Sequence, residues 1–337
     1  MFKHLISLSL CFSCTVLAQD AIQAKLANES ILLDITAPTA DSYVVVGERG
    51  HVLLGQTLTD SVQVPVPTKA TLTAVTHVGE RLWAVGHDHS ILHSIDAGQT
   101  WVSQYEDAGK ERPFLDVLFF DELHGVVAGA YGSFMRTRDG GQTWQKELHA
   151  SLLHPDDIAY LEEIRELDGE EFYLDELSSI LPHLNRLSYD GTTLYLAGEA
   201  GMLAKSVNAG ESWERIDIDY EGSFFDIITA GDKLIAGGLR GNLFIQSQGE
   251  SWTQVDLCHT SSINSLLLYN EQLTVMSNNG YIATIDYANL DTDPSCNDPQ
   301  VTVIQNANKV TVMNALPLNN TMIAVTSQGI ASLVNQK

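Results

Sequence analysis

The chain has 337 residues, of which 43 are acidic and 18 basic, so its formal net charge at pH 7 is −25. A protein with this negative charge repels nucleic acids and anionic lipids. We therefore expect neither of them as a partner. Nothing after the N-terminal segment approaches the roughly 18 consecutive apolar residues of a membrane-spanning helix, so we expect no direct membrane insertion.

Residues 1–18 have the pattern of a secretory signal peptide. A short basic start is followed by the apolar run LISLSLCFSCTVL, and the sequence Val-Leu-Ala before Gln19 suits signal peptidase. Lipidation at Cys11 or Cys14 fits poorly, because bulky residues precede both. We therefore expect an exported protein in the periplasm, with an extracellular or lipid-anchored location as the alternative. Residues 19–337 are expected to form a single domain.

Loss of the signal peptide would leave Cys258 and Cys296 as the two remaining cysteines. A disulfide is the default for such a pair in an oxidising compartment. Two separate thiols are the alternative, since nothing in the repeat pattern below obviously brings the two positions together.

One pattern occurs seven times: an apolar strand, a small residue, two variable residues and usually Gly. The copies are YVVVGERG (43–50), LWAVGHDH (82–89), GVVAGAYG (125–132), LYLAGEAG (194–201), LIAGGLRG (234–241), LTVMSNNG (273–280) and MIAVTSQG (322–329). Successive copies begin 39–49 residues apart, except for one step of 69. Further apolar strands, such as ILLDI (31–35), precede most copies. The sequence therefore predicts an all-β, seven-bladed β-propeller whose blades have strands A to D.

Four repeats continue into a second motif: SIDAGQTW (94–101), TRDGGQTW (137–144), SVNAGESW (206–213) and the shortened QSQGESW (246–252). Its Asp can accept hydrogen bonds from the N–H groups of its own turn, while the Ser and Thr hydroxyls close the hairpin. Its Trp begins strand D and covers the apolar edge of the blade. We assign this structural role to Asp96, Gly98, Trp101, Asp139, Gly141, Trp144, Asn208, Gly210, Trp213, Gly249 and Trp252. A group repeated in equivalent blades is not expected to be catalytic.

This motif resembles the Asp-box, or bacterial neuraminidase repeat, of sialidases, sortilin-type receptors and the photosystem II assembly-factor propellers. The assembly factors are the most similar group, because the export signal, the short blades, the VGxxG turns and the boxes all match. The chain differs from them in an acidic insertion and in a first and two final blades without a box. The resemblance implies a non-enzymatic, exported scaffold that binds a partner protein at the membrane and needs no cofactor.

The last repeat ends after its third strand. We expect the segment AIQAKLAN (21–28) to supply the missing strand D and close the ring, since an open sheet edge is normally avoided.

The 69-residue step marks an insertion at 150–183, between blades three and four. Pro155 and Gly169 suit the start and end of one helix, and apolar residues between 173 and 184 recur at helical spacing. We expect an acidic helical hairpin beside the mouth of the central channel, with its apolar side packed on the blades. A merely solvated decoration is the alternative.

Turns between strands B and C face the side of the ring where propellers usually bind ligands. Arg49 and Arg240 share a register in blades one and five, and Tyr131 lies in the corresponding turn of blade three. Together with the hairpin carboxylates Glu162, Glu163 and Glu166, which would steer a basic partner segment, these are the predicted partner-binding residues. Solvated turn residues are the alternative reading.

The evidence for an enzyme is weak. His87 and His89 in GHDH alternate within a turn and do not suit a metal site, and no phosphate-binding or nucleophile motif is present. The arginine cluster that a sialidase needs for its substrate carboxylate is not found. We therefore predict no catalytic, metal or cofactor residues. A sialidase-like glycoside hydrolase or a glycan-binding protein is the alternative function.

Overall fold

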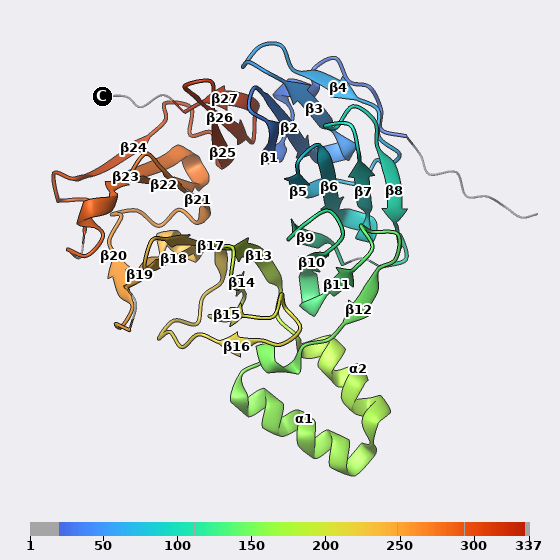
Figure 1. Ribbon diagram of the computed structural model, residues 1–337. Coiled ribbons are helices and arrows are strands. Elements are labelled where there is room, and N and C mark those ends of the chain that lie inside the picture. The colour runs from blue at the N-terminus through green and yellow to red at the C-terminus, as the bar shows by residue number, and fades with distance from the viewer. Residues whose placement is uncertain (1–19, 111, 248, 293, 334–337) are drawn as a thin grey trace, which may run out of the picture.

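The computed structural model describes residues 20–333 except 111, 248 and 293. The predicted signal peptide, with Cys11 and Cys14, lies outside these residues. Within them, seven antiparallel sheets surround a central axis, and the innermost strand of each sheet faces that axis (Figure 1). The prediction of a seven-bladed β-propeller is confirmed, including the two helices between blades three and four.

In chain order, strands A to D of each blade run outward from the axis. Blades one to three are β1 (Leu32–Thr39), β2 (Ser42–Gly47), β3 (Val52–Gly55), β4 (Val62–Val64); β5 (Leu72–Val78), β6 (Arg81–Gly86), β7 (Ile91–Ser94), β8 (Val102–Tyr105); and β9 (Phe114–Phe119), β10 (Gly125–Gly129), β11 (Phe134–Thr137), β12 (Gln145–Glu147). Blades four to seven are β13 (Leu184–Tyr189), β14 (Leu194–Gly198), β15 (Leu203–Ser206), β16 (Glu214–Arg215); β17 (Phe224–Ala230), β18 (Lys233–Gly238), β19 (Leu243–Ser247), β20 (Thr253–Val255); β21 (Ile263–Tyr269), β22 (Gln272–Ser277), β23 (Tyr281–Asp286), β24 (Val301–Gln305); and β25 (Val312–Leu318), β26 (Thr321–Thr326), β27 (Gly329–Ser332).

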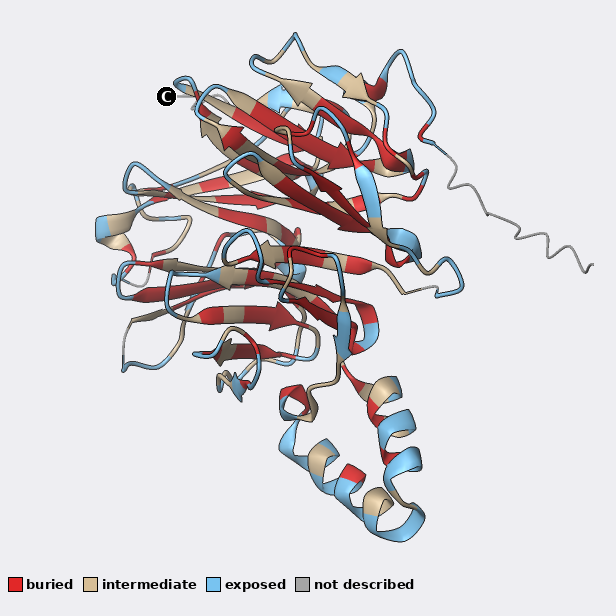
Figure 2. Ribbon diagram, turned by 45° about the vertical axis from the view of Figure 1, so that its right-hand side comes forward, coloured by how far each residue is buried: buried red, intermediate tan, exposed pale blue. Residues whose placement is uncertain are grey.

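The strands B are almost wholly apolar because each is buried between two neighbouring blades. In β2, Val44 and Val46 pack against blade two, while Tyr43 and Val45 pack against blade seven. Alternate side chains of a strand point to opposite faces, so one strand contributes to two interfaces. Seven apolar clusters result, one between each pair of adjacent blades. Figure 2 shows the buried residues concentrated in these strands.

A belt of hydrogen bonds joins the innermost strands around the axis. In blades one, three and five, an aspartate accepts the N–H of the next blade: Asp34 from Val75 (2.8 Å), Asp116 from Leu187 (2.6 Å) and Asp226 from Leu266 (2.7 Å). In blades two, four and six, a side chain donates to a carbonyl of the next blade: Thr73 to Phe114 (2.8 Å), Asn185 to Phe224 (2.7 Å) and Asn264 to Val312 (2.9 Å). Asn314 of blade seven donates to Asp34 at 2.7 Å and completes the belt.

Arg186 supplies the positive charge of this belt. Its guanidinium lies 3.6 Å from the Asp116 carboxylate and 3.7 Å from that of Asp226. Burial raises the pKa of Asp116 to about 6 even though Arg186 and two backbone N–H groups oppose it. Burial likewise raises the pKa of Asp226. The ionised carboxylates of the belt therefore depend on Arg186.

The expected closure of the ring by a strand from residues 21–28 is wrong. Within the described residues, blade seven is a three-stranded sheet, and the N-terminal segment ends in a 3₁₀ turn, Ala27–Glu29, beside β27. The segment is held instead along blade one, where Ala21 N–H donates to Val66 O at 2.9 Å and the Gln63 side chain bonds its backbone. Blades seven and one are joined by the belt and by their apolar cluster.

The Asp-boxes form compact turns between strands C and D. Asp96 accepts hydrogen bonds from the backbone N–H and the hydroxyl of Thr100, at 2.8 and 2.6 Å. The indole N–H of Trp101 donates to Gly98 O at 2.8 Å. Asp139 accepts the corresponding two bonds from Thr143 in blade three. In blade four, Asn208 accepts the Ser212 N–H at 3.0 Å and donates its side-chain amide to the Ser212 hydroxyl at 2.9 Å.

The insertion folds as α1 (Pro155–Asp168) and α2 (Glu170–Ile180), separated by Gly169, whose φ of 94° an L-residue would resist. Its buried side, including Leu161 and Leu177, packs with Phe134 and Trp213 of blades three and four. This contact lies toward the outer strands, so the hairpin extends beyond the rim of the ring (Figures 1 and 2). The expected position beside the channel mouth is wrong. No helix of the described residues is long and apolar enough to cross a bilayer.

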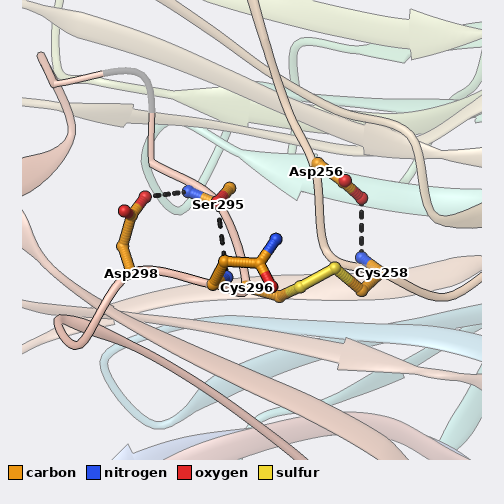
Figure 3. Close-up of a disulfide and its surroundings, with 6 residues drawn as sticks. Asp256, Cys258, Ser295, Cys296 and Asp298 are labelled. Atoms are coloured by element: carbon orange, nitrogen blue, oxygen red, sulfur yellow. Dashed lines mark hydrogen bonds between the residues drawn. A yellow bond between two sulfur atoms is a disulfide. The ribbon is translucent and has the colours of Figure 1, made fainter.

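Cys258 and Cys296 form a disulfide with Cα atoms 5.9 Å apart. Figure 3 shows how it ties the segment after β20 to the long loop before β24. Backbone contacts support the same junction: Cys296 N–H donates to Asp256 O at 2.8 Å, and the Asp256 carboxylate accepts Cys258 N–H at 2.7 Å. The connection from blade five to blade six is therefore fixed.

The substitution Arg186→Met should destabilise the ring by about 3–5 kcal/mol at pH 8, because it leaves buried carboxylates without a cation. The loss should be smaller at pH 5. A carboxyl group with a raised native pKa binds a proton in the folded state where the unfolded chain has released it, so its cost grows as the pH rises. Denaturant unfolding at both pH values measures this. Arg138→Met, which removes an exposed partner of Glu211, is the control. A loss of equal size at both pH values would contradict the prediction.

Replacing both cysteines by serine should lower the free energy of unfolding by up to about 4 kcal/mol, the chain-entropy value for a 38-residue separation. Since blades contact mainly their neighbours, the increase in amide hydrogen exchange should be confined to blades five and six. Thermal unfolding with and without reductant gives the same comparison in the wild-type protein. An unchanged melting temperature under reductant would contradict the predicted stabilisation by the disulfide.

Candidate partner-binding face

Each of three B–C turns has a central residue whose backbone is in the unfavourable left-handed conformation. Arg49, Tyr131 and Arg240 occupy the central positions of the turns Glu48–Gly50, Ala130–Gly132 and Leu239–Gly241, with φ values of 56°, 53° and 60°. Left-handed backbone costs an L-residue about 1–2 kcal/mol. Antiparallel strands place these turns and the D–A connections on the same face of the ring, and all three side chains are exposed. The structure thus brings the predicted ring residues to one face, in blades one, three and five.

Arg49 is the most isolated of the three. Its side chain is 79% exposed, and its nearest carboxylate, that of Glu48, is 3.9 Å away. A surface ion pair with this separation contributes little to the stability of the protein. The guanidinium is therefore available to a partner.

Tyr131 lies where the hairpin joins this face. The Arg112 guanidinium is 5.1 Å from the centre of the Tyr131 ring and donates to Ser178 O of α2 at 3.1 Å. His183 contacts the same ring edge-on, at 4.5 Å between centroids. Gly132 N–H donates to Pro182 O at 2.8 Å. These contacts fix the end of α2 against blade three.

Arg240 borders a hollow of about 320 Å³ that adjoins a second one of about 490 Å³. His259 lines both, and its ring stacks on Tyr281 at 4.3 Å. Its Nδ1 accepts Ser261 N–H at 3.2 Å, so Nε2 carries the proton, yet Nε2 is buried without a partner. Burial lowers the pKa of His259, with the charge of Asp256 opposing this shift.

Cations dominate the rim of these hollows. Arg240 and Lys309 lie on it, and both are exposed. Asp256 is the carboxylate among the lining residues of the smaller hollow. Cys258 forms part of the wall of the larger one. Polar donors in a fixed, shallow depression suit the backbone or side-chain oxygens of an extended peptide.

Arg112, which contacts Tyr131, belongs to a second group of cations with Lys110 and Lys146. Burial and repulsion from the other two lower the pKa of Lys146. Sequence analysis missed these residues, as it missed His259 and Lys309. Lys110, Arg112, His259 and Lys309 lie in D–A connections, which have no repeating pattern. The side of the ring on which they lie could have been inferred, because D–A connections share a face with the B–C turns, but their grouping around one site could not.

The hairpin carboxylates are placed differently from one another. Glu162 pairs with Arg165 at 2.7 Å, whereas Glu163 and Glu166 are exposed on α1. All three carboxylates lie away from the channel, so they do not form one binding site with Arg49 and Arg240.

His89, Arg136 and Arg186 have structural contacts of their own. His89 stacks on Phe114 at 4.4 Å and contacts Ser133, which accounts for its burial. Among the described residues, no group of three or more His, Cys, Asp or Glu side chains could hold a metal ion. Arg136 and Arg186 are engaged by carboxylates within their own blades or the belt, and are not arranged to receive a substrate carboxylate.

Residues 103–236 match the family described as Photosynthesis system II assembly factor YCF48. No curated protein matches the chain. Among solved structures, YCF48 bound to a D1 peptide superposes with a TM-score of 0.64 at 13% identity, covering 92% of this chain and 94% of that one. YCF48 from Cyanidioschyzon merolae gives a TM-score of 0.62 at 16% identity, with coverages of 93% and 97%. The WD40 β-propeller domain of Doa1 gives 0.63 at 12%, with coverages of 95% and 97%.

At such identities the structural likeness concerns the propeller fold, while the family match covers the boxes of blades three and four. The sequence-based resemblance is confirmed. The chain is an Asp-box β-propeller that resembles the photosystem II assembly factors.

Proposed function

We propose that the protein is a non-enzymatic scaffold that binds a segment of a partner protein on its B–C turn face. The observation that carries this proposal is that Arg49, Tyr131 and Arg240 are exposed together on one face of the ring, with Arg240 lining a hollow in that face. The hollow that Arg240 and His259 line adds a place for a peptide segment. The similar YCF48 structure was solved with a peptide of D1, which supports a peptide ligand here.

We further propose that the protein is exported to the periplasm and meets a membrane-associated or exported partner there. The sequence of residues 1–18 supports this, as does the disulfide, because disulfides persist in oxidising compartments. The strongly negative charge is compatible with a protein that approaches a membrane through a partner rather than through anionic lipid.

Partner binding can be tested by affinity capture from detergent-solubilised envelopes, with quantification by mass spectrometry. Arg240→Ala and Tyr131→Ala should each reduce capture of the same partner about tenfold, as expected when a central contact is truncated. Arg138→Ala is the matched control, because Arg138 lies in the Asp-box turn on the opposite face and pairs only with surface groups. Equal capture by all four proteins would reject the proposed face.

Export is tested separately by sequencing the N-terminus of the protein isolated from cells. Cleavage after Ala18 should leave Gln19 as the first residue, and the protein should fractionate with the periplasm. Replacing Leu8 and Leu10 by Asp should block both, because it interrupts the apolar run. An uncleaved N-terminus in the cytoplasmic fraction would contradict export.

A further inference from the structure

The hairpin has an apolar edge, which we define as the exposed Tyr160, Leu167 and Phe172 with the half-buried Ile164 between them. Tyr160, Leu167 and Phe172 are 49%, 74% and 62% exposed. Tyr160, Ile164 and Leu167 have the spacing of one side of α1. The Tyr160 hydroxyl donates to Glu176 of α2 at 3.3 Å, and Phe172 lies one helical turn before Glu176. Both helices therefore contribute to the same edge.

The fold of the hairpin does not require this edge. A different side of the helices, with Leu161, Tyr173 and Leu177, is buried against blades three and four. Arg165 pairs with Glu162 of its own helix at 2.7 Å. It joins α1 to α2 through Glu170 at 3.0 Å and the Tyr173 ring at 3.5 Å. Large apolar side chains that remain exposed on so firmly anchored an element usually mark an interaction surface.

The charge around the apolar edge specifies the chemistry of its ligand. Residues 155–180 contain ten carboxylates, and their single basic residue is Arg165, which is already engaged. Glu176 and Glu163 are close enough to the Tyr160 hydroxyl that their charge raises its pKa, that of Glu176 having the larger effect. A ligand that packs on Phe172 therefore meets a strongly negative surround.

We propose that the apolar edge binds a basic, amphipathic segment of the partner protein, whose apolar side packs on Leu167 and Phe172 while its Lys or Arg residues pair with Glu163 and Glu176. The inference rests on the proposed function, because it supplies a second contact for the same partner. An amphipathic helix laid on an apolar strip is a common mode of peptide recognition. A lipid surface fits less well, since the carboxylates would repel anionic headgroups.

The test is a fluorescence-anisotropy titration of the purified protein with a labelled synthetic helical peptide of Leu and Lys, with all Leu on one side. The double variant Leu167→Ser/Phe172→Ser should bind at least about tenfold more weakly than wild type. Its melting temperature should not change, because both side chains are exposed. Val207→Ser is the matched control, since Val207 is 80% exposed in the Asp-box of blade four, on the opposite face. The control should bind as wild type does.

The electrostatic part is tested with Glu163→Gln/Glu176→Gln, which should weaken binding and reduce its dependence on salt. Equal affinity of the Leu167→Ser/Phe172→Ser variant and the control would overturn the inference, because the overall negative charge would then explain binding. The inference would also be overturned if the wild-type protein bound phosphatidylglycerol vesicles and the Leu167→Ser/Phe172→Ser variant did not. Partner capture that still depends on Arg240 would, in either case, leave the proposed function standing. Wild-type protein that captures no partner would remove the proposed function itself.

Discussion

The hydrogen-bond belt around the central axis is the constraint on which the ring depends. Blades one to six each bond a backbone group of the next blade through a side chain, and the side chains of Asn314 and Asp34 bond blade seven to blade one. The innermost strands are therefore fixed in register around the circle. In the described residues the last blade has three strands, and Asn314 bonded to Asp34 connects it to the first. Buried carboxylates are strong acceptors, but they require a cation, and Arg186 provides it.

Much of this fold could be predicted because its signals are local. The strands B are continuous apolar runs since both of their faces are buried, and the Asp-box bonds within a single turn. The belt was not predicted, although Asp34, Asp116 and Asp226 occupy equivalent strand positions. Their bonding partners lie in the next blade, some 40 residues or more along the chain. A strand pattern does not specify such partners.

The candidate face was only partly predictable for the same reason. Arg49, Tyr131 and Arg240 could be grouped because the turn repeats in register, and alternation of strand direction sends each turn to the same side. His259 and Lys309 could not, because their connections are irregular and are positioned by packing and by the disulfide. The N-terminal segment failed as a strand because the Gln63 side chain and Val66 satisfy its backbone along blade one.

The hairpin shows how a large insertion is accommodated without disturbing the ring. It replaces one D–A connection, at a point outside the belt, and its buried side enlarges the apolar cluster that already joins blades three and four. Leu161 and Leu177 therefore share their environment with Phe134, so the hairpin has a fixed orientation relative to the blades. Arg112 connects it to Tyr131 on the partner-binding face. A ligand that contacts both the cations of the ring and the carboxylates of the hairpin would have to carry an acidic or polar segment and a basic one, separated along its chain. That requirement is more selective than either surface alone.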